Sequence, residues 1–213
     1  MSQNSTPNIL PNITGRFVKR LNKLLPFVAI GTIADCQSII EPTNRQLVKA
    51  GLKVLEYQSP FVGLEELMKQ TSLRSKMAQN YRLTSQDLAF SLSPILNSSG
   101  RISHARLSIA VLLSSNDSNP IPFAIYVGNA SLELENNPQQ LANTLIATNQ
   151  TRKDMVKEIL QEVEKEAKAQ VESGQEMIFL VGDWNKGIIG LLASRLVNQY
   201  DCPTIVVSRS CDL

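Results

Sequence analysis

The sequence predicts an α/β protein that is mostly helical in its first part and carries a βαβ unit and a long helix in its second. Three observations support this prediction. Apolar residues recur at helical spacing from Arg16 onward, and a long amphipathic stripe follows Pro138. Two short apolar runs then flank one further helix near the end of the sequence, which is the order of a βαβ unit.

The first 70 residues offer only amphipathic helices. The first helix, from Arg16, has its apolar positions at Phe17, Leu21, Leu24, Leu25 and Val28. A second helix is expected after Pro42, and a short third helix around residues 64–67 after Gly63. Because no strand is predicted to receive their apolar faces, this part resembles a piece of a larger fold.

The second part begins with the segment 88–94, followed by a loop through Gly100 and a helix over about 103–114. The stretch 123–134 is compatible with a strand or a loop. A long helix is expected from Pro138 to about Glu172, where Gly174 ends it. Strands at 177–181 and 204–207, joined by a helix over 188–200, should be parallel.

These patterns divide the chain into segments. Residues 1–15 are polar and contain prolines, which favours a disordered lead-in. Residues 16–75 form the first predicted domain, and the polar, basic residues 76–87 form an exposed linker. Residues 88–213 form the second predicted domain.

Composition excludes some functions. The net charge is +2, from 21 basic and 19 acidic residues, so nucleic-acid contact requires a local cluster of basic residues. Cys36, Cys202 and Cys211 lack metal-ligand spacing, and their odd number favours reduced thiols in a cytoplasmic protein. The apolar run 24–30 follows basic residues, but Pro26 and its distance from Met1 favour an interior segment over a signal peptide. No membrane partner is expected.

Asp35 follows an apolar helix or turn over residues 28–34. A carboxylate at the end of a buried segment suits Mg²⁺ or Mn²⁺, which prefer oxygen ligands. The alternative is a helix cap or a surface acid, and no second carboxylate or histidine stands nearby in the sequence.

Asn97 to Arg101 bring an amide, two hydroxyls, Gly100 and a guanidinium together ahead of a predicted helix. Such a cluster can bind phosphate, and helix capping by the serines is the alternative. His104 is the sole histidine of the sequence, which argues against a two-histidine metal site and favours a polar helix-start position.

Residues 182–190 form a loop with several glycines between a strand and a helix. Here Trp184 can stack on a base, and Asn185 or Lys186 can reach a phosphate. The alternative is a structural connection in which Trp184 fills the core. The glycine spacing does not match a nucleotide-cofactor fingerprint.

Together these segments resemble the RecJ family of single-strand-specific exonucleases, within the DHH phosphoesterase superfamily. Residues 31–35, Gly-Thr-Ile-Ala-Asp, resemble the family's metal-binding Gly-Thr-Val-Ala-Asp motif, and residues 94–101 resemble Pro-Arg-Ile-Asn-Ala-Ala-Gly-Arg. Asn149 with Arg152-Lys153 matches the long helix, and residues 184–196 match the opening of the DHH-associated second domain. The match covers most of residues 20–208.

The resemblance implies the C-terminal part of a DHH domain followed by an incomplete DHH-associated α/β domain. It also implies 5′-to-3′ degradation of single-stranded DNA with Mn²⁺ or Mg²⁺, in DNA repair and recombination. Asp35 would be a metal ligand. The residues expected to face nucleic acid are Asn97, Gly100, Arg101, Trp184, Asn185, Gly187 and Arg195.

The sequence also departs from the family pattern. It contains no Asp-His-His signature, Asn185 stands where the family usually has histidine, and Ile95 replaces an arginine. We therefore expect a RecJ-like exonuclease fragment that lacks both ends, binds single-stranded DNA weakly and is inactive alone. A separately encoded N-terminal half is a candidate partner. The alternative function is a non-catalytic, RecJ-derived module for protein interaction or nucleic-acid binding.

Overall fold

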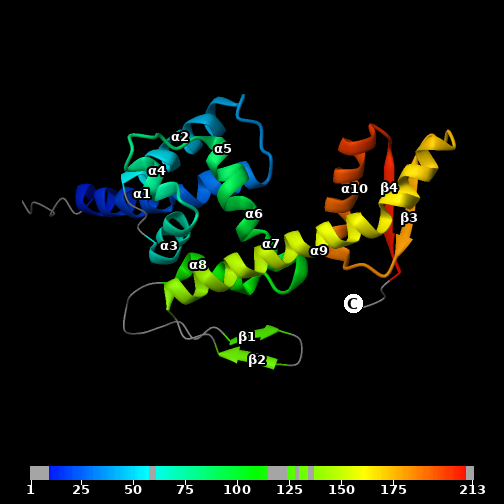
Figure 1. Ribbon diagram of the computed structural model, residues 1–213. Helices are drawn as coiled ribbons and strands as arrows, with labels where there is room; N and C mark the ends of the chain where they lie inside the picture. The colour runs from blue at the N-terminus through cyan, green and yellow to red at the C-terminus, as the bar shows by residue number, and fades with distance from the viewer. Residues whose placement is uncertain (1–9, 58–60, 115–123, 128–129, 134–136, 210–213) are drawn as a thin grey trace, which may run out of the picture. The chain divides into compact units, whose positions relative to one another are not determined.

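The computed structural model describes residues 10–57, 61–114, 124–127, 130–133 and 137–209. The chain forms two compact units, residues 1–93 and 94–213 (Figure 1). The division lies well beyond the boundary predicted near residue 75. The predicted linker 76–87 belongs to the first unit, because Leu83 and Asp87 are buried and the Leu83 N–H donates to Glu56 Oε1 at 3.0 Å. The polar composition of residues 76–87 predicted an exposed segment, although Leu83 and Asp87 are buried.

In the described part of the first unit, every regular element is a helix, as the sequence predicts. The elements are α1 (Leu10–Ala34), α2 (Pro42–Tyr57), α3 (Val62–Gln70), α4 (Leu73–Met77), α5 (Ser85–Asp87) and the π-helix η1 (Leu88–Leu92). Helix α1 begins at Leu10, so residues 10–15 are helical rather than part of a disordered lead-in; residues 1–9 lie outside the described residues. Pro11 lies in the first turn, where proline's missing N–H costs no helical hydrogen bond.

The core of the first unit is aliphatic. Helices α1 and α2 pack against each other, and the rings of Phe27 and Phe61 meet with centroids 4.1 Å apart. A half-buried arginine connects α4 to two other elements, because Arg74 forms a bidentate ion pair with Glu65 and donates to the Leu55 carbonyl at 2.7 Å. The second and third predicted helices are thus confirmed, whereas α4 and α5 were not predicted.

The second unit is built around one long helix. Its elements are α7 (Ser98–Ile102), α8 (Arg106–Leu113), β1 (Ala124–Val127), β2 (Ala130–Glu133), α9 (Pro138–Glu172), β3 (Ile178–Gly182), α10 (Lys186–Tyr200) and β4 (Thr204–Ser208), and the short α6 (Ser93–Leu96) begins at the division. Helices α7, α8 and α10 and strand β3 all pack against α9, which Figure 1 shows as one uninterrupted helix. The predicted bounds of α9 are confirmed, and Gly174 follows it with φ of 80°.

The βαβ prediction is also confirmed. Strands β3 and β4 pair in parallel, with Ile178 opposite Thr204, and α10 connects them. The side chains of Ile178 and Leu180 point into a core with α9 and α10, whereas Phe179, Val181, Ile205 and Val207 remain exposed on the sheet. Strands β1 and β2 form an antiparallel hairpin in the stretch for which a strand or a loop was expected.

One predicted loop is wrong. The segment from Pro94 through Gly100 is helical, in α6 and α7. The reason is that its serine hydroxyls bond inside the fold: Ser98 Oγ donates to the Ile95 carbonyl at 2.6 Å, and Ser99 Oγ bonds Ser108 Oγ at 2.7 Å. Both serines are fully buried, so their hydroxyls are not available to a phosphate.

Candidate nucleic-acid interface

Three arginines from three helices of the second unit come together: Arg101 of α7, Arg152 of α9 and Arg195 of α10. The pKa of Arg152 is lowered from its usual value, first because burial disfavours the charged guanidinium and then because Arg101 and Arg195 repel it. Guanidinium groups nevertheless keep their proton at neutral pH. The arrangement is therefore a concentrated positive charge.

No acidic side chain of the described residues forms an ion pair with any of these three arginines. Arg152 Nε is buried and lacks a hydrogen-bond partner within that part of the chain, and one turn earlier the buried Asn149 Oδ1 also lacks one. A buried donor without an acceptor costs about 1–3 kcal/mol. An anion from outside the chain would offset the positive charge of the three guanidinium groups.

Arg101 is held by a close contact between α7 and the first turn of α10. Its Nη1 donates to the Gly187 carbonyl at 3.2 Å. A Cβ on Gly187 would collide with the backbone of Arg101 at its Cα, C and O atoms. Only glycine permits this approach, so Gly187 acts through the packing of α7 and α10.

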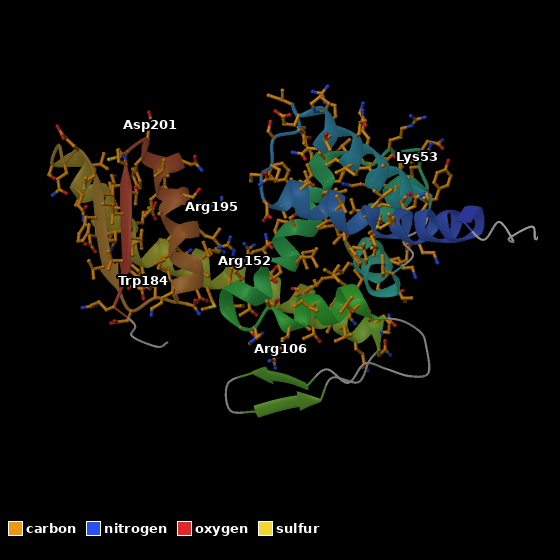
Figure 2. All side chains as sticks on the ribbon, turned by 180° about the vertical axis from the view of Figure 1, so that it is seen from behind. Lys53, Arg106, Arg152, Trp184, Arg195 and Asp201 are labelled. Atoms are coloured by element: carbon orange, nitrogen blue, oxygen red, sulfur yellow. The ribbon has the colours of Figure 1, made fainter. Side chains whose placement is uncertain are left out.

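A cavity of about 480 Å³ lies between α9 and α10. Its lining combines basic, amide or hydroxyl, and aliphatic side chains: Arg152, Lys153, Val156, Leu160, Leu191, Ser194, Arg195, Asn198 and Gln199. A second hollow of about 310 Å³ shares several of these residues and reaches Lys157 and Glu164. Figure 2 shows the labelled side chains of Arg152 and Arg195 close together where α9 passes α10.

The other expected contact residues have varied surroundings. Asn185 is the N-cap of α10, and its Oδ1 accepts the Gly187 N–H at 2.7 Å. Asn97 is exposed at the N-terminus of α7 and makes no side-chain cap, and Gly100 is exposed within α7. Gly187 thus contacts Arg101, Asn185 bonds to Gly187, and Asn97 and Gly100 lie at the start of α7 and within it.

Trp184 requires a correction. It is 8% exposed and belongs to the core cluster formed by α9, β3 and α10. Its indole lies over Gly182, where any Cβ would collide with the ring. The alternative of a core residue therefore holds, because a buried ring offers no face on which a base can stack.

Asp35 lies in the first unit, exposed in the turn after α1, with its backbone N–H bonded to the Gly31 carbonyl at 3.0 Å. Among the described residues, no three His, Cys, Asp or Glu side chains gather in a way that could hold a metal ion. A single carboxylate supplies too few oxygens for Mg²⁺ or Mn²⁺. These residues therefore do not by themselves fit a complete divalent-metal site.

His104 has a structural contact rather than a catalytic one. It is exposed, and its Nδ1 accepts the backbone N–H of Arg106 at 3.2 Å, which supports the start of α8. This agrees with the expected polar position at a helix start.

Arg152 and Lys153 entered the sequence analysis only through the family resemblance, and Lys157 did not enter at all. The spacing of these residues could have indicated a shared face, because positions 152, 153, 156, 157 and 160 all lie on one side of a helix with about 3.6 residues per turn. Basic residues thus flank the apolar pair Val156 and Leu160. The partner side chain, Arg195, comes from a separate helix, and a local pattern could not reveal that the two meet.

Within the described residues, no helix is both long enough and apolar enough to cross a membrane. A scan of the chain against protein-family models gives no match.

Comparison with characterised proteins finds single-stranded-DNA-specific exonucleases named RecJ. The chain is 29% identical over 199 residues to RecJ of Escherichia coli K12 and 30% identical over 196 residues to RecJ of Salmonella typhimurium LT2. These matches cover 92% and 90% of the chain and 30% of each relative. RecJ of Bacillus subtilis 168 is 28% identical over 186 residues, covering 87% of the chain and 20% of that protein.

The fold agrees with solved structures. RecJ of Thermus thermophilus in complex with Mg²⁺ superposes with a TM-score of 0.66 at 23% identity, over 88% of this chain and 26% of that one. An exonuclease RecJ bound to manganese gives a TM-score of 0.65 at 22% identity, over 88% and 41%. The chain spans about 30% of the length of the two enterobacterial relatives. These matches, which extend across nearly all of the chain, support a fragment of the RecJ family.

Proposed function

We propose that this chain is a segment of a RecJ-like exonuclease that acts on single-stranded DNA, and that its second unit binds the DNA backbone. The observation that carries the proposal is the group formed by Arg101, Arg152 and Arg195, which no carboxylate of the described residues neutralises. Phosphate oxygens are the natural partners of guanidinium groups, because they accept two parallel hydrogen bonds. We call these three residues the arginine cluster.

Charge balance supports a local interface over a general one. With a net charge of +2, long-range attraction of a polyanion is weak, so affinity must come from the arginine cluster and nearby lysines. Lys153 and Lys157 extend the positive surface along α9. We therefore expect weak binding that depends strongly on salt.

Hydrolysis needs more than the described residues offer. In the longer enzyme, Mn²⁺ or Mg²⁺ would activate a water molecule and offset charge that develops on the phosphate. Asp35 is our candidate for one ligand, and the arginine cluster would position the strand. The 5′-to-3′ direction and a role in repair and recombination are part of the same proposal. The isolated chain should bind DNA without cleaving it.

Binding is tested by fluorescence anisotropy with a labelled oligothymidine and a duplex of equal length. The proposal expects the single strand to bind more tightly than the duplex, and Arg101→Gln to weaken single-strand binding. The matched control is Lys165→Gln, which removes one exposed positive charge from α9 at a position that lines neither cavity. Equal losses in the two variants would reject a localised interface.

Cleavage is tested by incubating a 5′-phosphorylated single strand with the chain and Mn²⁺. We expect no release of nucleotides. Processive cleavage that Asp35→Ala abolishes would refute the inactivity of the isolated chain and would support the metal-ligand role of Asp35. Restored cleavage on adding a separately expressed N-terminal half would support a divided enzyme.

The exposed sheet face favours one alternative, a non-catalytic module that binds a protein partner. Four apolar side chains lie there without cover in the described structure: Phe179, Val181, Ile205 and Val207. A contiguous exposed apolar surface of this kind often marks an interface. Stable co-purification with the N-terminal half, combined with no affinity for DNA, would favour the module.

A further inference from the structure

The cavity between α9 and α10 is lined by basic side chains from both helices. Arg152 and Lys153 come from α9, and Arg195 comes from α10. None of the described residues that line this cavity carries a carboxylate. Positive charge therefore faces the cavity from both helices, while Glu164, which accepts from Gln199 Nε2 at 3.4 Å, lines the adjoining hollow.

The remainder of the lining is divided by chemistry. Val156, Leu160 and Leu191 form an apolar wall, and Ser194, Asn198 and Gln199 add hydroxyl and amide groups. The volume of about 480 Å³ falls within the usual range for small-molecule sites. Such a lining suits a group that is anionic at one end and less polar at the other.

Arg152 supplies the second, independent observation. Its Nε is buried without a hydrogen-bond partner among the described residues, and Arg101 and Arg195 both repel its guanidinium. A guanidinium placed solely for stability would pair with a carboxylate or a carbonyl. Arg152 instead has unused hydrogen-bonding capacity beside the cavity.

We propose that this cavity binds one nucleotide unit, with its phosphate on Arg152 and Arg195 and its sugar against Val156, Leu160 and Leu191. The inference rests on the proposed function, and it adds a defined phosphate subsite. The shared chemistry is a phosphate with non-bridging oxygens, which a backbone phosphodiester and a terminal monophosphate both supply.

Isothermal titration of the full 213-residue chain at low salt tests the subsite with three probes: inorganic phosphate, TpT and 5′-phosphorylated pTpT. Arg152→Gln and Arg195→Gln should each weaken binding of the dinucleotides about tenfold, because each removes a charge-assisted bidentate contact. Lys165→Gln should bind like the wild type. Equal affinities for TpT and pTpT would identify a backbone phosphodiester, and preference for pTpT would identify a terminal phosphate.

Thermal unfolding without ligand separates a binding role from a structural one. Arg152→Gln should unfold at the same or a higher temperature than the wild type, because it relieves repulsion from Arg101 and Arg195. A clear fall in the unfolding temperature would assign Arg152 to the fold and overturn the proposal. Should Arg152→Gln not fold, the exposed Arg195→Gln decides the outcome.

Failure of the subsite and failure of the proposed function give different results. Wild-type affinity in both arginine variants, while a long single strand still binds, would reject the subsite and leave the function standing. Arginine-dependent binding of the dinucleotides without any affinity for a long single strand would support the subsite and reject the proposed function. A wild-type chain that binds none of the three probes would also overturn the subsite.

Discussion

Gly187 determines how closely α7 approaches α10, and through that contact it places Arg101. The carbonyl of Gly187 accepts from Arg101 Nη1, and the backbone of Arg101 occupies the space that a side chain at position 187 would need. The glycine and the arginine therefore act as a pair. In the sequence both were expected to face nucleic acid, but only the arginine has a charge to offer.

Gly187→Ala should lower the free energy of unfolding by about 1–3 kcal/mol, because α7 and α10 must move apart. Gly190→Ala is the matched control, since the same helix has open space at position 190. Removing a helix-interior glycine there should raise stability by about 0.5–1 kcal/mol. Urea unfolding of both variants checks the prediction, and equal effects would show that the contact is unimportant.

Asp87 is the buried carboxylate that closes the turn before η1. Its Oδ2 accepts from the Thr84 N–H and hydroxyl, each at 2.8 Å, and from the Tyr81 hydroxyl at 3.0 Å. Burial alone would raise the pKa of this carboxyl, but the hydrogen bonds from Thr84 and Tyr81 outweigh it and lower the pKa. A depressed pKa means that the folded state favours the ionised form.

Asp87→Asn should therefore cost about 1–3 kcal/mol of stability at neutral pH, through the lost charge-assisted bonds. This contribution is complete above the unfolded-state pKa of about 3.9 and disappears as the pH falls through the lower folded-state pKa. The gap between wild type and variant should thus shrink as the pH falls below about 3.9. Denaturant titrations at neutral and acid pH measure it, and a constant gap would contradict the assignment.

At the scale of elements, long periodic patterns were predicted well. The 35-residue helix α9, the parallel pair β3 and β4 and the connecting helix α10 follow directly from apolar spacing. Local composition misled elsewhere: the serines before Gly100 indicated a loop, although their hydroxyls bond within the helical segment. The linker prediction missed that Leu83 bonds to Glu56, which is 27 positions away, and it overlooked the local capping box of Thr84 and Asp87.

In the candidate site, too, local motifs could be recognised in the sequence, whereas contacts between distant residues could not. Arg101, Asn185, Gly187 and Arg195 could be named as candidates from the sequence, because each lies in a segment that resembles the RecJ family, and their contact with nucleic acid stays a prediction. The cavity could not be predicted, since Arg152 and Arg195 lie 43 positions apart in the sequence and meet only through the packing of α9 on α10. Trp184 shows the converse case, where a residue in a motif proves to be part of the core.

The start of α10 allows a test of one element. Asn185→Ala should destabilise the protein by about 1 kcal/mol, because the Gly187 N–H loses its acceptor. Asn185→Asp keeps an acceptor and adds a negative charge at a helix N-terminus, so its stability should match that of the wild type. Thermal unfolding of the pair checks this, and equal losses in both would reject capping as the role of Asn185.

For the molecule as a whole, the two units carry different parts of the proposed activity. The first unit holds Asp35, the candidate metal ligand, and the second holds the arginine cluster. The similarity to RecJ proteins is the reason for proposing a metal-ligand role for the first part and a DNA-binding role for the second. The chain nevertheless spans only about 30% of the length of its enterobacterial relatives. Recognition of the DNA backbone is thus the function that this chain can be expected to show without other polypeptide.

The central claim is that the arginine cluster binds the phosphates of single-stranded DNA, and the salt dependence of binding tests it most directly. Three phosphate contacts predict a slope of about −2 for log affinity against log salt concentration, and losing one contact should reduce its magnitude by about 0.7. We predict that reduction for Arg195→Gln and an unchanged slope for Lys165→Gln. Identical slopes for the wild type and Arg195→Gln would contradict the account.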